Sequence, residues 1–372
     1  MLIQGTCIWD ISRIPDRDET RMELTDLVRF KEHWYCGFRE GKIHHDHPSG
    51  RARIIRSADG ASWESAALFE WDGGSVRAPR LSITAEGHLM VATSVYFVSR
   101  GPRLDANAMG DDGEPLPPEV KARRDRPGCY YQLDAPGTPA TDEESQVARQ
   151  SVSWLSADGL NWSTAFADVS GVNAHRWSVT WHNGMGYSNS ETGKDKGGTL
   201  YRTRDGKTWR ALVHGFAPEG FNGSEVSLAF GEDNTAYGLF RGGARHVLLG
   251  TGKAPYYQEW EWKNLTVDAG AEHGETQPSH EILEAPFGGP KLIRLSDGRF
   301  VAAGRILWPW RDDGRVNLLL LDPGKALLTQ FAEFDGTSYA GVFEHEGLLW
   351  VTFTDRLASE VLLGKVDVPA RT

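Results

Sequence analysis

Residues 57–63 read SADGASW, and the same pattern returns as SADGLNW at 156–162 and as TRDGKTW at 203–209. Each copy follows a short run suited to a β-strand: ARIIR, SVSWL or TLYRT. Because Gly accepts positive φ, Asp-Gly between two strands is a strong hairpin signal. The hydroxyl and carboxylate can bond nearby backbone N–H groups, and the Trp can bury its ring on the same unit. Three copies therefore predict a repeated β-hairpin unit.

The spacing of the copies indicates a repeat with one long insertion. The second and third copies lie 47 residues apart, whereas the first and second lie 99 apart, about two periods. The segment at about 101–150 accounts for the excess and is rich in Pro, Gly and charge. Insertions in repeat proteins map to loops on one face, often the binding face. We therefore expect one repeat, at about 76–170, to carry a loop insertion.

A second element opens each repeat: a strand, a turn and another strand. Apolar residues alternate around E-G, N-G, D-N or D-G turns in several of these segments. The residues at about 2–11 form a lone strand, which in a propeller usually completes the last blade. We predict an all-β fold, a six-bladed propeller of four-stranded antiparallel blades in one domain, 1–372. The opening segments are 24–41, 78–95, 176–190, 224–242, 288–305 and 338–356.

Composition excludes several functional classes. The net charge of −11 argues against nucleic-acid binding, because neutralising phosphates needs a basic surface. No window approaches 18 consecutive apolar residues, so we expect no membrane span. The N-terminus lacks the features of a signal peptide, so the chain as written predicts a cytoplasmic protein, or a secreted one if a leader was removed. Cys7, Cys36 and Cys129 lack metal-like spacing, which favours inert thiols.

The repeated Asp-Gly turns and the six opening hairpins resemble the sialidase (neuraminidase) superfamily, whose turn motif is the Asp-box or BNR repeat. The resemblance covers nearly the whole chain outside 101–150. It implies the propeller fold and an exo-acting glycoside hydrolase without a cofactor. In this family a tyrosine is the nucleophile. A glutamate takes its proton, an aspartate is the acid/base, and three arginines hold the substrate carboxylate, for which guanidinium forks are well suited.

The resemblance assigns three catalytic positions. Tyr339, in Ser-Tyr-Ala-Gly at the opening of blade 6, resembles the nucleophile, although a packed aromatic would also fit there. Glu225, in SEVSLAF of blade 4, resembles its proton acceptor. Asp46 lies in the HHDH run of blade 1, where the acid/base is expected. Neighbouring residues on a strand or loop point apart, so we do not expect HHDH to bind a metal.

The arginines of the carboxylate clamp match less uniformly. Arg241, which ends AYGLFR in blade 4, resembles one of them, and the alternative is a surface arginine at a strand end. In blade 5 Arg315, in Arg-Val-Asn-Leu, is preferred over Arg305 and Arg311. The Arg-Ile-Pro that opens blade 1 in sialidases is absent near the hairpin. Arg21 lies near the expected position, and Arg39 is a possible substitute.

Further candidates lie at strand starts near the expected axis. Arg80 opens an inner strand of blade 2, and Arg176 stands beside His175 and Trp177 in blade 3. Arginines gathered at the axis of an acidic protein would suit an anionic ligand, although local pairing with Asp or Glu is a common alternative. Trp308 is a candidate platform for a sugar ring, with Trp310 beside it.

These observations predict a sialidase-like hydrolase that removes a terminal acidic sugar from a glycan. Because folds do not determine function, two alternatives stay open. One is a carbohydrate-binding propeller that has lost hydrolysis, which the missing blade 1 motif would favour. The other is a propeller enzyme of different carbohydrate chemistry, such as a lyase or another glycosidase. The sequence does not define the oligomeric state.

Overall fold

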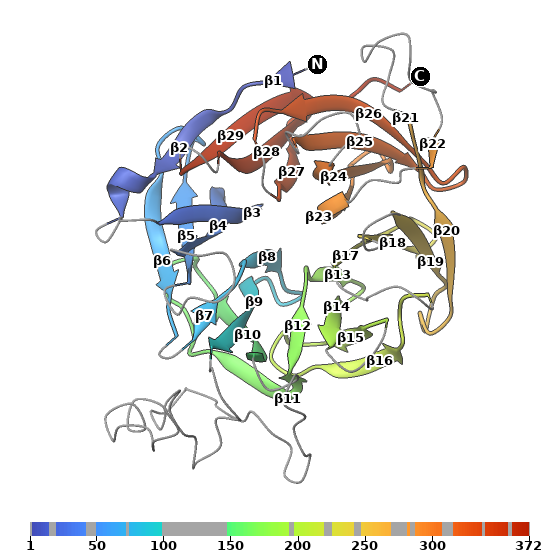
Figure 1. Ribbon diagram of the computed structural model, residues 1–372, viewed down its shortest axis with the longest axis horizontal. Helices are drawn as coiled ribbons and strands as arrows, with labels where there is room; N and C mark the ends of the chain where they lie inside the picture. Colours follow the sequence, from blue (N-terminus) through green and yellow to red (C-terminus); the bar gives the residue numbers. More distant parts are fainter. Residues whose placement is uncertain are drawn as a thin grey trace.

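The computed structural model describes residues 2–14, 20–41, 50–71, 74–98, 147–192, 197–218, 225–241, 247–268, 281–282, 287–306, 315–336, 339–355 and 359–371. Within these ranges the strands form six sheets arranged around a central axis (Figure 1). Each sheet contains a four-stranded antiparallel unit, which confirms the predicted six-bladed propeller. Among the described residues the only helix is the short η1 (Ile11–Arg13), so no described helix is long and apolar enough to cross a membrane.

The blades follow one another in chain order. Blade 1 comprises β3 (Arg21–Phe30), β4 (His33–Gly41), β5 (Arg51–Ser57) and β6 (Glu64–Phe69). Blade 2 comprises β7 (Ser75–Val76), β8 (Arg80–Ile83), β9 (Leu89–Val98), β10 (Val147–Ser156) and β11 (Phe166–Val172). Blade 3 comprises β12 (Ala174–Arg176), β13 (Thr180–His182), β14 (Met185–Thr192), β15 (Thr199–Thr203) and β16 (Arg210–His214).

The second half of the ring has the same plan. Blade 4 comprises β17 (Val226–Phe230), β18 (Ala236–Phe240), β19 (Leu248–Gly252) and β20 (Trp260–Asn264). Blade 5 comprises β23 (Phe287–Arg294), β24 (Phe300–Ile306), β25 (Val316–Asp322) and β26 (Leu327–Phe334), widened by β1 (Leu2–Ile3), β21 (Thr266–Asp268) and β22 (Glu281–Ile282). Blade 6 comprises β27 (Gly341–His345), β28 (Leu348–Asp355), β29 (Glu360–Asp367) and β2 (Thr6–Asp10).

Two pairings concern the ends and the long insertion of the chain. The N-terminal β2 adds to β29 as the fourth strand of blade 6, so strands from both ends of the chain share one sheet. In blade 2, β10 pairs with β9 over its full length, from Val147 opposite Val98 to Ser156 opposite Leu89. Most of the expected insertion at 101–150 lies outside the described residues, and its last residues belong to β10.

The three Asp-Gly turns have one hydrogen-bonding plan. In the first, Asp59 Oδ1 accepts hydrogen bonds of 2.8 Å from the amides of Ala61 and Ser62, and Ser57 Oγ accepts one of 2.8 Å from Gly60 N. The turns at 156–162 and 203–209 repeat these contacts with Asp158 and Asp205. The side chains therefore hold the backbone of each turn as the local chemistry predicts.

The glycines of these turns lie against the preceding blade. A Cβ on Gly60 would lie 2.4 Å from the ring of Trp350, and one on Gly159 would lie 2.0 Å from Tyr35 Oη. Both glycines also have positive φ, of 75° and 80°. The Asp-Gly motif therefore serves two purposes: it turns the chain, and it lets one blade pack closely on the next.

The hydrophobic core lies between the blades. Six clusters of buried side chains each combine residues from two adjacent blades, so that every blade interface has a cluster of its own. Phe69 of blade 1, for example, stacks on Trp154 of blade 2 with ring centroids 4.5 Å apart. Because the blades are held by such interfaces, the first strand of each is held close to the axis, where a site can form from several blades.

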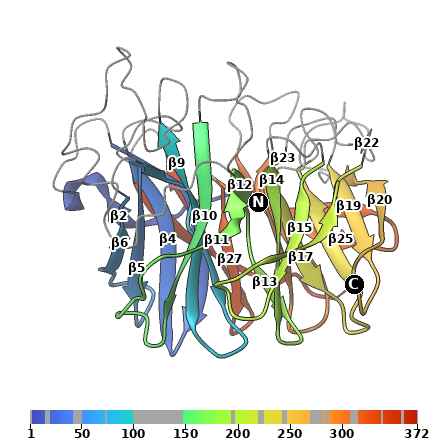
Figure 2. The same ribbon diagram turned by 90° about the horizontal axis from the view of Figure 1, so that it is seen from below.

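The strands run between two ends of the molecule (Figure 2). The first strand of every blade begins at one end. We call it the Tyr339 end, because Tyr339 lies two residues before β27. At the other end the third strand turns into the fourth; we call it the Asp-turn end, because the turns at 57–63, 156–162 and 203–209 lie there.

Candidate functional site

A small apolar cluster lies on the axis at the Tyr339 end. It contains Leu24, Ala78, Trp177 and Tyr339, which come from blades 1, 2, 3 and 6. The rings of Trp177 and Tyr339 meet edge to face with centroids 5.6 Å apart. Residues far apart in sequence are therefore in contact here, because the first strands of the blades converge at the axis.

The hydroxyl of Tyr339 meets two charged side chains of blade 4. It donates a hydrogen bond of 2.9 Å to Glu225 Oε1. Arg241 Nη1 donates to the same carboxylate oxygen at 2.9 Å and to the Tyr339 hydroxyl at 3.1 Å. Glu225 precedes β17 and Arg241 follows β18, and the two are paired across the strand ends by a 3.0 Å backbone hydrogen bond from Arg241 N to Glu225 O. The structure thus brings these three predicted residues into mutual contact.

Two neighbouring groups position Tyr339 and Glu225. Thr25 donates to the Tyr339 carbonyl from its amide at 3.2 Å and from its hydroxyl at 3.0 Å. Gly289 N donates a 2.9 Å hydrogen bond to Glu225 Oε2. Gly289 has a φ of 62°, and a Cβ there would lie 1.9 Å from Tyr339 Cγ. The position therefore requires glycine, a requirement that sequence reasoning missed although the Gly-Gly pair of blade 5 signals it.

Burial raises the pKa of the Tyr339 hydroxyl, and the negative charge of Glu225 raises it further. Only 8% of Tyr339 is exposed. The hydroxyl is therefore protonated at neutral pH and donates to the carboxylate, while Arg241, whose side chain is 32% exposed, connects the pair to the surface. A neutral tyrosine beside a carboxylate acceptor is the arrangement needed to activate an oxygen nucleophile when substrate binds.

Arginines of three blades surround the Tyr339 ring. Besides Arg241, the guanidinium carbon of Arg80 lies 5.9 Å from the ring centroid, and so does that of Arg305. Arg80 is buried, stacks on Trp177 at 3.8 Å and donates to the carbonyl of Thr25 at 3.1 Å. Burial lowers the pKa of Arg80, and Asp26, Glu225 and Tyr339 oppose that shift. In the described part of the chain, no acceptor meets its Nε or Nη2 atoms.

In blade 5 the structure distinguishes the candidate arginines. Arg305, on β24, faces Tyr339 as described above. Arg315, which the local motif favoured, contacts two acidic residues that follow each other closely in blade 5: its Nη1 is 3.6 Å from Glu333 and its Nε is 3.8 Å from Asp335. Arg311 lies outside the described residues. The structure therefore places Arg305, which the sequence offered as the alternative to Arg315, beside the Tyr339 ring.

Blade 1 contributes an apolar residue at the axis. Leu24, with a φ of 64°, lies within an irregularity of the β3–β4 pairing and packs against Tyr339. Arg21 is exposed at the start of β3. Arg39 is fully buried, 4.0 Å from Glu23 and 3.4 Å from Ser75 Oγ. Burial and the neighbouring charge of Arg77 lower the pKa of Arg39 to about 10.

Two other predicted residues, Asp46 and Trp308, lie outside the described residues, as do the HHDH run and Trp310. Among the residues that the structure describes, no group of three His, Cys, Asp or Glu side chains could hold a metal ion.

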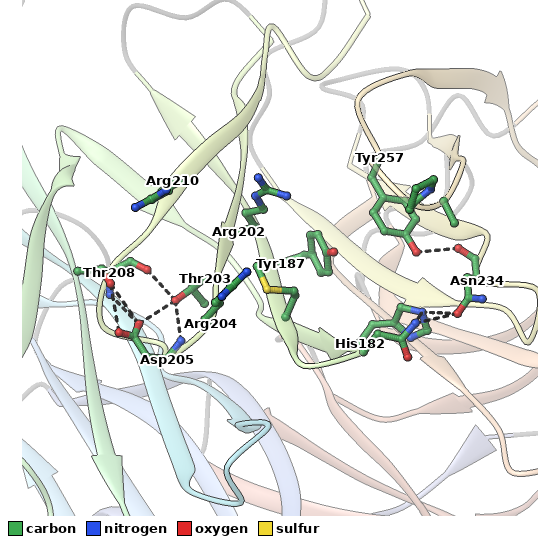
Figure 3. Close-up of a pocket in the computed structure, with 14 residues that line it drawn as sticks. His182, Tyr187, Arg202, Thr203, Arg204, Asp205, Thr208, Arg210, Asn234 and Tyr257 are labelled. Carbon is green, nitrogen blue, oxygen red and sulfur yellow. Dashed lines mark hydrogen bonds between the residues drawn. The ribbon is translucent and has the colours of Figure 1, made fainter.

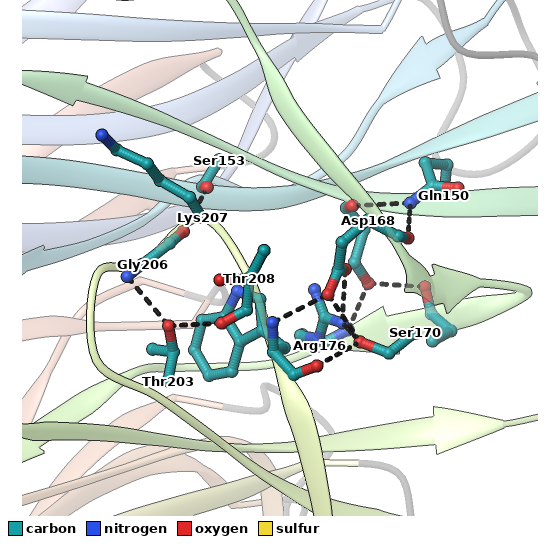
Figure 4. A network of polar contacts seen from close by, with 12 residues as sticks. Gln150, Ser153, Asp168, Ser170, Arg176, Thr203, Gly206, Lys207 and Thr208 are labelled. Atoms are coloured by element: carbon teal, nitrogen blue, oxygen red, sulfur yellow. Dashed lines mark hydrogen bonds and ion pairs between the residues drawn. The ribbon is translucent and has the colours of Figure 1, made fainter.

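Arg176 belongs to a different network, between blades 2 and 3 (Figure 4). Its Nη2 donates to Asp168 Oδ1 at 2.9 Å and also contacts Ser170 Oγ. The other oxygen of Asp168 accepts a 2.8 Å hydrogen bond from Trp209 N, and the guanidinium stacks on the Trp209 ring at 4.9 Å. Burial lowers the pKa of Arg176, and Asp168 opposes that shift. Arg176 therefore links blades and does not reach Tyr339.

Sequence reasoning also missed a buried ion pair on the inner strands. Lys291 Nζ of β23 lies 2.7 Å from Asp26 Oδ1 of β3, and Leu81 N of β8 donates to Asp26 Oδ2 at 2.9 Å. Asp26 is fully buried. The sequence offers little signal for it, because Asp26 is one of several charged residues in β3 (RMELTDLVRF). The pair joins blades 1, 2 and 5 close to the axial cluster.

No protein-family model matches this chain, and no curated protein matches it in sequence. Solved structures share its fold over nearly its whole length. A Dyadobacter fermentans protein of unknown function is 13% identical, with a TM-score of 0.67 and 98% of each chain covered. A Penicillium chrysogenum α-L-arabinanase, solved with arabinobiose, is 12% identical, with a TM-score of 0.58, covering 98% of this chain and 97% of that one. An intramolecular trans-sialidase from Ruminococcus gnavus, solved with oseltamivir carboxylate, is 11% identical, with a TM-score of 0.60, covering 93% and 94%.

The fold is therefore the propeller shared by sialidases and arabinanases. Identities this low carry the architecture and not the chemistry, because one fold hosts many functions. The function must be argued from the site.

Proposed function

We propose that this protein is an exo-acting glycoside hydrolase that uses Tyr339 as its nucleophile. The observation that supports this most is the contact of the Tyr339 hydroxyl with both Glu225 and Arg241. A buried tyrosine that only packs needs one acceptor for its hydroxyl. Here it meets a carboxylate able to take its proton and a cation able to stabilise the resulting phenolate.

The proposed reaction has two steps. Glu225 accepts the phenolic proton while the Tyr339 oxygen bonds to the anomeric carbon, and the bond from that carbon to the leaving oxygen breaks. Asp46, between β4 and β5 in the sequence, donates a proton to that oxygen. Asp46 then takes a proton from water, which attacks the anomeric carbon, and the tyrosine leaves and recovers its proton from Glu225. The cycle is balanced and needs no cofactor.

The arginines suggest the class of substrate. Arg241 and Arg305 approach Tyr339 from adjacent blades and would hold a carboxylate on the terminal sugar. Leu24 and Trp177 would contact apolar parts of the same ring. We therefore propose a terminal acidic sugar, sialic acid or a related ulosonic or uronic acid, as the substrate.

A glycosidase acting on a neutral sugar is the second candidate. It is favoured by Leu24, which fills the blade 1 position against Tyr339 where the sialidase resemblance implies an arginine. The described arginines against Tyr339 come from blades 2, 4 and 5, and that of blade 2, Arg80, is buried beneath Trp177. The shared fold with an α-L-arabinanase makes an α-L-arabinofuranoside the natural neutral test substrate.

The test is release of 4-methylumbelliferone from its α-sialoside, β-glucuronide and α-L-arabinofuranoside. Wild type is compared with Tyr339→Phe and with Tyr256→Phe, a control at an exposed tyrosine. Turnover of an acidic glycoside that falls at least about 10³-fold only in Tyr339→Phe is expected. Turnover of the arabinofuranoside alone would favour the second candidate. Absence of turnover of all three, together with saturable binding of the free sugars, would replace both with a carbohydrate-binding function.

A further inference from the structure

A cavity of about 710 Å³ lies between blades 3 and 4 at the Asp-turn end (Figure 3). Its lining includes Asn234, which follows β17, whereas Glu225 of the axial site precedes the same strand. A five-residue strand, about 17 Å long, therefore separates the cavity from the axial cluster. The volume lies in the range typical of small-ligand sites.

The blade 3 wall of the cavity carries an unusual row of side chains. In the sheet register Tyr187 of β14 lies opposite Arg202 of β15, which in turn lies opposite Arg210 of β16. Directly opposite residues point to one face of a sheet, and all three line the cavity. Like charges placed directly opposite destabilise a strand pair. Arg202 and Arg210 therefore form a pair that an anion between them would stabilise.

A third cation extends this row. Arg204 is two residues beyond Arg202 and lines the same cavity. Among the described residues, no acidic side chain forms an ion pair within 4.0 Å of Arg202, Arg204 or Arg210. The one acidic residue of the lining, Asp205, accepts hydrogen bonds of 2.8 and 3.0 Å from the amides of Lys207 and Thr208. The wall is thus a local cationic surface on a chain of net charge −11.

The rest of the lining, from both blades, offers rings and fixed polar groups. Tyr257 donates from its hydroxyl to the Asn234 carbonyl at 2.9 Å, and its ring meets that of Tyr187 with centroids 5.4 Å apart. Asn234 Oδ1 is 2.9 Å from His182 Nε2 and accepts from Asn183 Nδ2 at 3.0 Å. His182 is itself stacked on Phe230 at 4.2 Å. These contacts hold amide, imidazole and tyrosine groups in place facing the arginines.

We propose that this cavity is a second, non-catalytic binding site for an acidic saccharide. Arg202 and Arg210 hold the carboxylate of one sugar unit, since a guanidinium pair matches the geometry of an oxyanion. The amide groups of Asn183 and Asn234 meet hydroxyls of the sugar, and the buried Tyr187 and Tyr257 form the packed wall behind them. The site requires none of the groups at the axis, so the proposal stands or falls separately from the proposed hydrolase activity.

The test is isothermal titration calorimetry with 3′-sialyllactose and trigalacturonic acid, with lactose and sodium sulfate as comparison ligands. It is run on a protein that carries Arg241→Met and Arg305→Met, in which both proposed axial carboxylate contacts are removed. We expect saturable binding of at least one acidic saccharide and none of lactose. Adding Arg202→Gln and Arg210→Gln is expected to weaken that binding at least tenfold. Lys207→Gln, on the same turn but outside the lining, should leave it unchanged.

Three results would overturn the proposal. These are the absence of saturable binding of either acidic saccharide, equal affinity in the arginine double variant, and binding of sulfate as tight as that of the saccharides. All three arginines of the wall are exposed, so the variants are expected to fold. If the double variant nevertheless melts at a lower temperature than its parent, Arg204→Gln alone supplies the same comparison, with a smaller expected loss of affinity.

Discussion

Arg176 and Arg241 both lie at the end of a strand, β12 of blade 3 and β18 of blade 4, yet they lie in contrasting regions of the molecule. Arg176 is buried between blades 2 and 3, where it pairs with Asp168 and stacks on Trp209 (Figure 4). Arg241 has a side chain that is 32% exposed and meets Glu225 and Tyr339 near the axis. Each forms an ion pair with a carboxylate, so pairing alone does not separate a structural arginine from a functional one.

The difference lies in what else each ion pair touches. The acceptor of Arg176 is also bonded to the backbone of a turn, which leaves little for a ligand to contact. The acceptor of Arg241 is shared with the hydroxyl of a tyrosine, so the same carboxylate can exchange a proton. Arg176, whose carboxylate partner also bonds to backbone, therefore holds blades together. Arg241, whose carboxylate partner also accepts from the Tyr339 hydroxyl, is placed where it can take part in a reaction.

The largest effect expected is on stability. Arg176→Met leaves the largely buried Asp168, whose side chain is 12% exposed, without its cation, and breaking a buried pair costs about 3–5 kcal/mol. We expect the free energy of unfolding in urea to fall by that amount, while activity per folded molecule is unchanged. The double variant Arg176→Met with Asp168→Leu should recover part of the loss. Unaltered stability in the single variant would show that the network does not hold blades 2 and 3 together.

Arg241→Met should show the opposite behaviour: a large loss of activity with little loss of stability. Loss of one cation at a developing phenolate is expected to lower kcat/KM by about 10²–10³ on the glycoside that the wild type turns over, as for a lost oxyanion-stabilising donor. The free energy of unfolding should change by only about 1 kcal/mol, because the Arg241 side chain is 32% exposed and Glu225 keeps its hydrogen bonds from Tyr339 and Gly289. A large loss of stability with intact kcat/KM would make Arg241 equivalent to Arg176 and remove the contrast.

Gly289→Ala probes how tightly the Tyr339 region is packed. The new methyl group would lie 1.9 Å from Tyr339 Cγ, so the ring or the strand must move. We expect a loss of about 1–3 kcal/mol in the free energy of unfolding, together with reduced turnover, as is typical of overpacking. Gly347→Ala has a similar φ of 78° but open space around its Cβ, and it is the matched control for backbone strain. Equal losses in the two variants would mean that contact with Tyr339 does not matter.

The smallest effect concerns the Asp-turn end and its dependence on pH. Hydrogen bonds from the amides of Ser62 and Ala61 hold the pKa of Asp59 down at about 2, below its ordinary value near 4. A lowered pKa in the folded state gives stability that is present above about pH 4 and is lost as pH falls towards 2. Thermal melts at pH 5 and pH 3 should therefore show a smaller acid-induced fall in Tm for Asp59→Asn than for wild type. Parallel falls would contradict this account of the turn.

The blades could be predicted from the sequence because their signals are local. The Asp-Gly turns carry their own hydrogen-bonding groups, and the alternation of apolar residues around each turn reports which face of a strand is buried. These signals lie within about 20 residues and need no knowledge of the rest of the chain. The contact of Tyr339 with Glu225 and Arg241 was expected from residues that match a known pattern in blades 4 and 6.

Other parts of the site depend on distant neighbours. Arg305 and Arg315 both flank strand ends of blade 5, and only the register of β24 and β25 turns the first towards Tyr339 and the second towards Glu333. Leu24 lies at the axis because the β3–β4 pairing is irregular between Glu23 and Asp26, and no local sequence motif predicts that irregularity.

The sequence by itself thus determined the number of blades, their order and the chemistry of their turns, because each depends on residues close together in the chain. The tertiary structure decided which arginine meets Tyr339, which one ties blades together, and that three cations line a cavity between blades 3 and 4. Those outcomes depend on strand register and on the approach of neighbouring blades, which arise from packing across the whole ring.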